Sequence, residues 1–205
     1  MLLVGTFVGS ARAMVLTLDA GGIADNISTP AFSLGSTTGL TDGFPLTEYS
    51  NSAPGGLDIG LRLSGPGQVT FEYLGSEASD INSLEVDSGG GFATVFTQGT
   101  AINFEQTFSL VGGLVPFRFV TSGAGGSAEN GGPFGGILQI AFADLGNGSF
   151  IALFGDGAGD NDHDDFAVKI SAVSGVPLPP AVWLFISAIL GLVSFTRMRR
   201  SQKTA

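Results

Sequence analysis

Hydrophobic and polar residues alternate with a period of two along most of this chain. In residues 57–64 every second position is Leu or Ile, and the positions between them are polar or glycine. Residues 69–73 follow the same alternation, which is typical of half-buried strands. The pattern predicts further strands over residues 14–18, 93–97, 104–110, 117–121, 137–142, 150–154 and 166–171.

Glycine-rich segments separate these runs, and no convincing amphipathic helix precedes Pro180. Short strands divided by such turns predict an all-β fold, an antiparallel β-sandwich of jelly-roll type. The segment 64–67, Ser-Gly-Pro-Gly, predicts a hairpin between the two strands that flank it. With 17 Phe there is enough apolar bulk for a core, so the 33 Gly indicate turns rather than disorder.

The charge is unevenly distributed. All 18 acidic residues lie between Asp19 and Asp165, whereas only Arg62, Arg118 and Lys169 are basic between residues 14 and 175. A body this acidic repels nucleic acid, so we expect no nucleic-acid partner. It would attract divalent cations or basic surfaces, although acidity alone also keeps an extracellular protein soluble. The chain has no cysteine, which excludes disulfides and thiol chemistry.

Both ends differ from this body. Residues 1–13 contain a short apolar run and an Ala-Arg-Ala cleavage-type site, as in a secretory signal peptide. The basic segment that normally precedes the apolar run is missing, so we expect the true start to lie upstream. We expect residues 14–175 to form the exported domain and residues 176–205 to form a separate tail.

The tail has three parts in a fixed order. Residues 176–180 read Val-Pro-Leu-Pro-Pro, residues 181–196 are apolar and uncharged, and a basic end follows over residues 197–205. A helix over the apolar run would be roughly 25 Å long, close to the thickness of a hydrocarbon core of about 30 Å. Trp183 suits the interface at one end of this helix, and Arg197, Arg199 and Arg200 would hold the other end in the cytoplasm.

This arrangement resembles the PEP-CTERM sorting signal of Gram-negative bacteria, in the variant whose motif reads Val-Pro-Leu-Pro-Ala. The matching motif residues are Val176, Pro177, Leu178 and Pro179, while Pro180 replaces the alanine and residues 201–205 extend past the arginines. The resemblance implies an exosortase as partner and the inner membrane as a transient anchor. It also implies a final location at the cell surface or outside the cell. The alternative is an ordinary C-terminal membrane anchor with a proline-rich stem.

A second resemblance lies within the body. Residues 69–84, VTFEYLGSEASDINSL, are similar to a segment that recurs in ectodomains of this type, where a strand leads into a Gly-x-Glu-Ala turn and an Asn. The similarity implies a β-rich ectodomain and no particular activity.

One segment carries a candidate for chemistry, the Asp-rich turn before the last strand. Its carboxylates are Asp156, Asp160, Asp162, Asp164 and Asp165. Alternating Asp in a glycine-containing loop can supply the oxygen ligands that Ca²⁺ requires, so this turn is a candidate calcium site between two strands, with Asp160, Asp162 and Asp165 as the main ligands. This turn also resembles an Asp-rich turn of PEP-CTERM ectodomains in which His163 replaces an aromatic residue. The alternative is a solvated turn whose Asp side chains accept hydrogen bonds from backbone amides.

His163 is the only histidine, and we expect it to be an exposed turn residue. Without Cys or a second His it cannot form a zinc site of the usual His/Cys kind, and no Gly-x-Ser-x-Gly supplies a serine nucleophile. The resemblance of the tail to the PEP-CTERM signal implies a non-enzymatic surface or matrix protein associated with extracellular polysaccharide. Two alternatives remain: a calcium-dependent carbohydrate-binding module, although Tyr49 and Tyr73 are the only tyrosines for stacking on sugar, and a hydrolase using a carboxylate pair such as Glu72 and Glu77.

Overall fold

The regular secondary structure of the body consists almost entirely of β-strands. The computed structural model describes residues 14–28, 32–51, 58–123, 126–156 and 163–173. Of these residues 52% lie in strands and 3% in helix, so the all-β prediction is confirmed. The elements are β1 (Leu16–Leu18), β2 (Ile23–Asn26), α1 (Gly35–Thr38), β3 (Pro45–Ser50), β4 (Leu61–Leu63), β5 (Gly67–Gly75), β6 (Asn82–Asp87), β7 (Phe92–Thr97), β8 (Glu105–Leu110), β9 (Gly113–Leu114), β10 (Phe117–Thr121), β11 (Ser127–Glu129), β12 (Gln139–Asp144), β13 (Ser149–Gly155) and β14 (Phe166–Val173).

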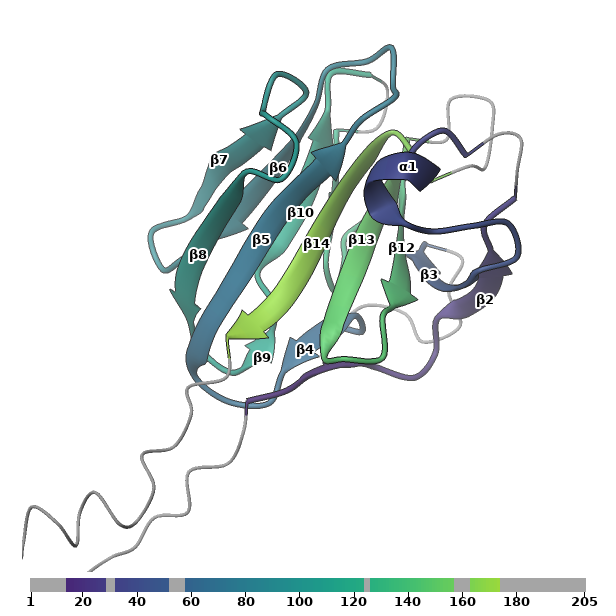
Figure 1. The fold of residues 1–205 in the computed structure, drawn as a ribbon. Helices are drawn as coiled ribbons and strands as arrows, with labels where there is room; N and C mark the ends of the chain where they lie inside the picture. The colour runs from purple at the N-terminus through teal and green to yellow at the C-terminus, as the bar shows by residue number, and fades with distance from the viewer. Residues whose placement is uncertain (1–13, 29–31, 52–57, 124–125, 157–162, 174–205) are drawn as a thin grey trace, which may run out of the picture. The chain divides into compact units, whose positions relative to one another are not determined.

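The strands form three antiparallel sheets. The largest has the order β2-β3-β12-β13-β14-β5-β8, a second has the order β11-β10-β6-β7, and a third has the order β1-β4-β9. In Figure 1 the strands β6, β7 and β10 lie behind the seven-stranded sheet. Residues 14–174 form one compact unit.

The main core lies between the sheets, as in a β-sandwich. Alternate residues of the seven-stranded sheet, such as Phe71 and Phe154, point toward alternate residues of the four-stranded sheet, such as Phe117 and Phe119. The rings of Phe119 and Phe154 stack with centroids 5.1 Å apart, and those of Phe71 and Phe117 meet edge-on at 6.0 Å. The third sheet adds Leu16, Leu61 and Leu63 to the same core. We call this side of the seven-stranded sheet its inner face.

A smaller apolar cluster covers the other side of the seven-stranded sheet, its outer face. The segment between β2 and β3, which includes α1, packs onto this face, and Figure 1 shows α1 in front of the sheet. The cluster consists of Ile27, Phe32, Leu34, Leu40, Leu46, Leu74, Ala141, Ala143, Ile151, Leu153 and Ala167. Its sheet residues are smaller than those of the inner face, because the covering layer is a short loop rather than a second sheet.

The predicted strands are present, but one predicted connection is wrong. Most runs with alternating hydrophobic residues contain a strand within about two residues of the expected bounds, but in the run over residues 57–64 the strand β4 covers only Leu61–Leu63. The segment 64–67, however, does not close a hairpin. β4 pairs with β1 and β9, whereas β5 pairs with β14 and β8, so the turn carries the chain from one sheet to another.

Several predictions for the ends of the chain concern residues outside the described ranges. These are the signal peptide over residues 1–13, the sorting motif over residues 176–180, the helix over residues 181–196 and the basic end. Among the residues that are described, no helix has the length and apolar character needed to cross a membrane.

Candidate functional site

The Asp-rich turn connects β13 to β14, as the sequence predicted. Asp160 and Asp162 lie outside the described residues. Asp156, Asp164 and Asp165 are all buried, and Asp164 has no exposed surface at all. The described part of the turn is therefore packed into the protein rather than spread on its surface.

The carboxylates of this turn accept hydrogen bonds from backbone amides. Asp165 accepts one from the backbone N–H of Asp156 at 2.6 Å, and Asp164 accepts one from the backbone N–H of Ser33. Such bonds are expected from the alternative role of the turn, in which Asp side chains accept hydrogen bonds from backbone amides. They do not test calcium binding, which stays a prediction.

The structure brings together the turn after β5 and the Asp-rich turn before β14. The hydroxyl of Ser76 donates to the carbonyl of Asp165 at 2.5 Å, and the side-chain amide of Asn82 approaches the same carbonyl at 3.4 Å. The backbone N–H of Glu77 donates to the carbonyl of Asp164 at 3.1 Å. The Gly-x-Glu-Ala turn after β5 therefore holds the Asp-rich turn in place through its backbone.

His163 is not the exposed turn residue that the sequence suggested. Its exposed fraction is 1%, and its backbone has the left-handed φ of 57°. This conformation is uncommon for residues other than glycine. The imidazole lies over the outer face of the sheet, beside Gly155. There its Nε2 lies 3.0 Å from Oδ2 of Asp25. The expectation was wrong because acidic neighbours in the sequence are typical of an exposed segment. The fold instead places the ring next to the carboxylate of Asp25, which is distant in the sequence.

His163 meets two acidic side chains that sequence reasoning did not single out. Asp25 lies on β2 and Glu48 on β3, and the antiparallel register places Asp25 opposite Leu46 and Glu48 opposite Ile23. Residues that oppose one another share a face, so both carboxylates stand on the outer face two positions apart. One candidate ligand atom from each of Asp25, Glu48 and His163 lies within 4.8 Å of the others.

The buried polar atoms that lack a partner are found at this turn and beside it. Among the described residues they are Nδ1 of His163, Oδ1 of Asp164 and Oδ1 of Asn82. His163 and Asp164 belong to the turn, and Asn82 contacts Asp165. Each such atom costs about 1–3 kcal/mol if nothing replaces the interaction with water. Their concentration in one place indicates a region whose polar groups are incompletely satisfied by the protein alone.

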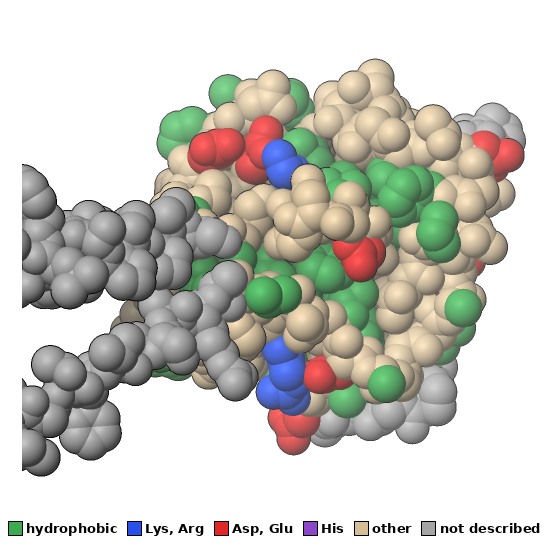
Figure 2. Space-filling model, turned by 60° about the horizontal axis from the view of Figure 1, so that its bottom comes forward, with side chains coloured by type: hydrophobic (Ala, Val, Ile, Leu, Met, Phe, Trp, Pro, Cys, Tyr) green, Lys and Arg blue, Asp and Glu red, His purple; other side chains and the backbone are tan. Residues whose placement is uncertain are grey.

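Every basic side chain in the described part of the body is paired elsewhere. Arg62 contacts Asp19 at 2.5 Å, Arg118 contacts Glu85 at 2.7 Å and Lys169 contacts Glu72 at 2.8 Å. Figure 2 shows Lys and Arg side chains lying next to Asp and Glu side chains on the face in view. Within the described residues, the carboxylates around His163 therefore have no Lys or Arg as a counter-charge.

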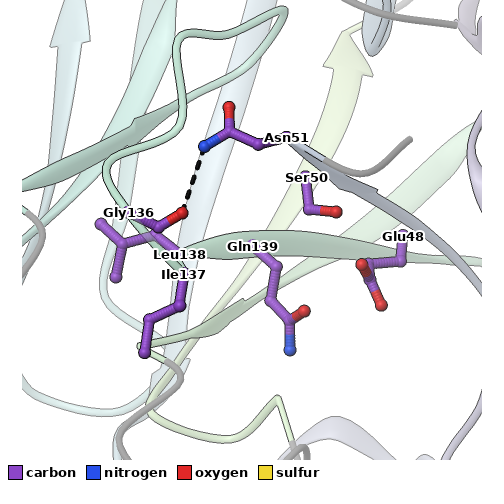
Figure 3. Close-up of a pocket in the computed structure, with 7 residues that line it drawn as sticks. All are labelled: Glu48, Ser50, Asn51, Gly136, Ile137, Leu138 and Gln139. Atoms are coloured by element: carbon purple, nitrogen blue, oxygen red, sulfur yellow. Dashed lines mark hydrogen bonds between the residues drawn. The ribbon is translucent and has the colours of Figure 1, made fainter. Parts of the chain in front are cut away.

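A shallow pocket lies next to this cluster. It is lined by Glu48, Ser50, Asn51 and residues 136–139 and has a volume of about 230 Å³. In Figure 3 the side chains of Glu48 and Gln139 extend toward the same side from the neighbouring strands β3 and β12, whereas Asn51 donates to the carbonyl of Gly136. Solvent can thus reach the cluster from the side of Glu48.

Most of the residues considered for the alternative functions are buried or paired with other side chains. Tyr49 and Tyr73 are buried, so neither offers a ring for stacking on a sugar. Burial, together with the charge of Asp19, raises the pKa of Tyr49 to about 12, and burial also raises the pKa of Tyr73. Glu72 forms the ion pair with Lys169 on adjacent strands, and Glu77 is an exposed turn residue.

Comparison of the chain with protein-family models, with curated proteins and with solved structures found no match.

Proposed function

We propose that this chain is an exported, non-enzymatic protein of the cell surface or extracellular matrix of a Gram-negative bacterium, anchored by its tail and processed by an exosortase. The observation that carries the proposal is the order of parts over residues 176–200: a Val-Pro-Leu-Pro motif, an uncharged apolar run and three arginines. Each part alone is common, and their combination is what resembles the sorting signal.

The position of the last strand supports this proposal. β14 ends at Val173, before the motif begins, and it is hydrogen-bonded to β13 on one side and β5 on the other. A cut within residues 176–180 would therefore remove no residue of any described strand. The released body would keep the whole of the seven-stranded sheet and both apolar clusters.

The division of charge supports the same topology. All 18 acidic residues precede the tail, and Arg197, Arg199 and Arg200 follow the apolar run. Basic residues after a membrane helix favour the cytoplasmic side, which leaves the acidic body outside. We propose that the exported body associates there with extracellular polysaccharide. We also propose that Ca²⁺ binds at the Asp-rich turn.

The test is to express the full chain behind a functional signal peptide in a host with and without an exosortase. We expect the intact chain in the membrane when the enzyme is absent. When it is present, we expect a shorter product whose mass places the new end at or next to residues 176–180. A Pro177→Ala/Pro179→Ala variant should remain uncut, whereas Pro66→Ala, an exposed proline in the turn between β4 and β5, should be processed like the natural chain.

An intact membrane-bound chain in both hosts would show that the tail is an ordinary anchor. A chain that stays in the cytoplasm despite a functional signal peptide would contradict the exported location itself.

A further inference from the structure

We propose that Asp25, Glu48 and His163 form a binding site for a divalent transition-metal ion of the Zn²⁺ type. The ion would tie the β2–β3 edge of the seven-stranded sheet to the turn between β13 and β14. The proposal is independent of whether the tail is processed.

The geometry is close to that of a metal centre. The candidate ligand atoms of the three side chains lie within 4.8 Å of one another. Zn²⁺ binds imidazole nitrogen and carboxylate oxygen at about 2.0–2.2 Å, which places tetrahedral ligands roughly 3.5 Å apart. Small rotations of side chains that already converge would therefore suffice to enclose an ion.

The ligand types distinguish this site from the calcium site expected at the Asp-rich turn. Ca²⁺ prefers six to eight oxygen ligands, whereas an imidazole with two carboxylates suits Zn²⁺ and similar transition ions. His163 is the only histidine in the chain, and the fold places its ring next to the carboxylate of Asp25, which is 138 residues away in the sequence. Three protein ligands leave a coordination position for water, and the pocket beside Glu48 gives solvent access to it.

Charge and burial make a cation favourable at this position. Glu48 is 8% exposed and His163 is 1% exposed, and a second carboxylate stands beside them. Burying a charge without a counter-charge is costly. The three basic side chains of the described body are paired with Asp19, Glu85 and Glu72, so none of them serves these carboxylates. A divalent ion would supply the missing positive charge.

The imidazole itself provides the observation that points to a ligand. Its Nε2 contacts Asp25, but Nδ1 is buried and has no hydrogen-bond partner. A metal-bound histidine uses one ring nitrogen as ligand and the other as hydrogen-bond donor. With a metal ion bound, one ring nitrogen would be a ligand and the other would be a hydrogen-bond donor. The buried ring would thus gain a second interaction that the protein does not supply.

The test uses the full chain, purified in detergent without a polyhistidine tag and stripped of metal with a chelator. Zn²⁺ is then added and the bound metal is measured after dialysis and by calorimetric titration. We expect one ion per chain, with affinity reduced roughly tenfold or more in Glu48→Gln and in His163→Asn. Asparagine is chosen because it tolerates the left-handed backbone of residue 163. Glu105→Gln, which changes the net charge equally on the exposed strand β8, should bind like the natural chain.

Three results would overturn the proposal. One is no binding of Zn²⁺, and a second is equal binding by all four proteins, which would show attraction to the acidic surface in general. The third is displacement of Zn²⁺ by an equal concentration of Ca²⁺, with His163→Asn binding Ca²⁺ normally, which would assign the cation to an oxygen-only site.

A second measurement needs no variant and so does not depend on whether the variants fold. In the natural chain loaded with Co²⁺, a bound imidazole gives a strongly shifted exchangeable proton resonance in the NMR spectrum. Because the chain has a single histidine, one such resonance would assign it to His163. Absence of the resonance in a chain that has bound Co²⁺ would exclude His163 as a ligand.

Discussion

The two faces of the seven-stranded sheet are built from the same strands but differ in what they bury. On the inner face large aromatic residues pack against a second sheet, with ring pairs such as Phe119 and Phe154 in contact. On the outer face small residues such as Ala141 and Ala167 meet a loop with one short helix, and the apolar cluster ends at Asp25, Glu48 and His163.

The difference indicates a division of roles between the faces. Aromatic burial supplies most of the hydrophobic stabilisation, because each ring removes a large apolar area from water. The outer face has a thinner cover and retains buried polar atoms without partners, among them Nδ1 of His163 and Oδ1 of Asp164. Stability is expected to depend mainly on the inner face, and ligand binding on the outer one.

The largest effect should come from truncating the inner face. Phe154 and Leu153 are neighbours on β13, both fully buried, and they point to opposite faces. Phe154→Ala should lower the free energy of unfolding by about 3–5 kcal/mol through lost burial and a cavity. Leu153→Ala should cost less, about 2 kcal/mol, because the covering loop can relax into the space. Denaturant unfolding of the full chain in detergent measures both values, and a larger loss for Leu153→Ala would contradict the division of roles.

A smaller effect is expected where the outer face meets His163. A Cβ added at Gly155 would lie 3.0 Å from Cγ and Nε2 of Gln139 and 3.2 Å from Nδ1 of His163. Gly155→Ala should therefore destabilise the protein by about 1–3 kcal/mol, as overpacking does. Gly90→Ala is the matched control, because its Cβ would meet no atom within 4 Å. Equal unfolding midpoints for the two variants would show that the imidazole does not pack tightly on β13.

Local alternation was enough to predict most of the strands and the all-β class. Strands with clear alternation, such as β5 and β10, were expected where they occur. β6 was missed because Asn82 occupies an inward position that a hydrophobic residue would mark, and β3 was missed because Pro45 and Glu48 interrupt its pattern. The hairpin at residues 64–67 was wrong since a local turn does not reveal whether its two strands belong to one sheet.

The candidate site was only half visible in the sequence. The Asp-rich turn and its place between two strands were predicted from composition and spacing. Asp25 and Glu48 could not be found, because they are two of 18 acidic residues and only the pairing of β2 with β3 brings them together. The burial of His163 follows from its contact with Asp25, and no property of neighbouring residues encodes a contact over that separation.

The smallest effect at neutral pH should come from Tyr49→Phe, at the rim of the inner face. The hydroxyl of Tyr49 donates to the carbonyl of Asp19 at 2.5 Å, and its loss should cost about 1 kcal/mol. Burial and the charge of Asp19 raise the pKa of this phenol to about 12, whereas in the unfolded chain it ionises near 10. The folded protein therefore holds this proton up to a higher pH than the unfolded chain does. The contribution of the neutral Tyr49 phenol to the free energy of unfolding is complete below pH 10 and is lost as the pH rises toward 12. The difference in unfolding free energy between the natural chain and Tyr49→Phe should shrink over that interval, and a constant difference would show that the phenol ionises as freely in the folded protein as in the unfolded chain.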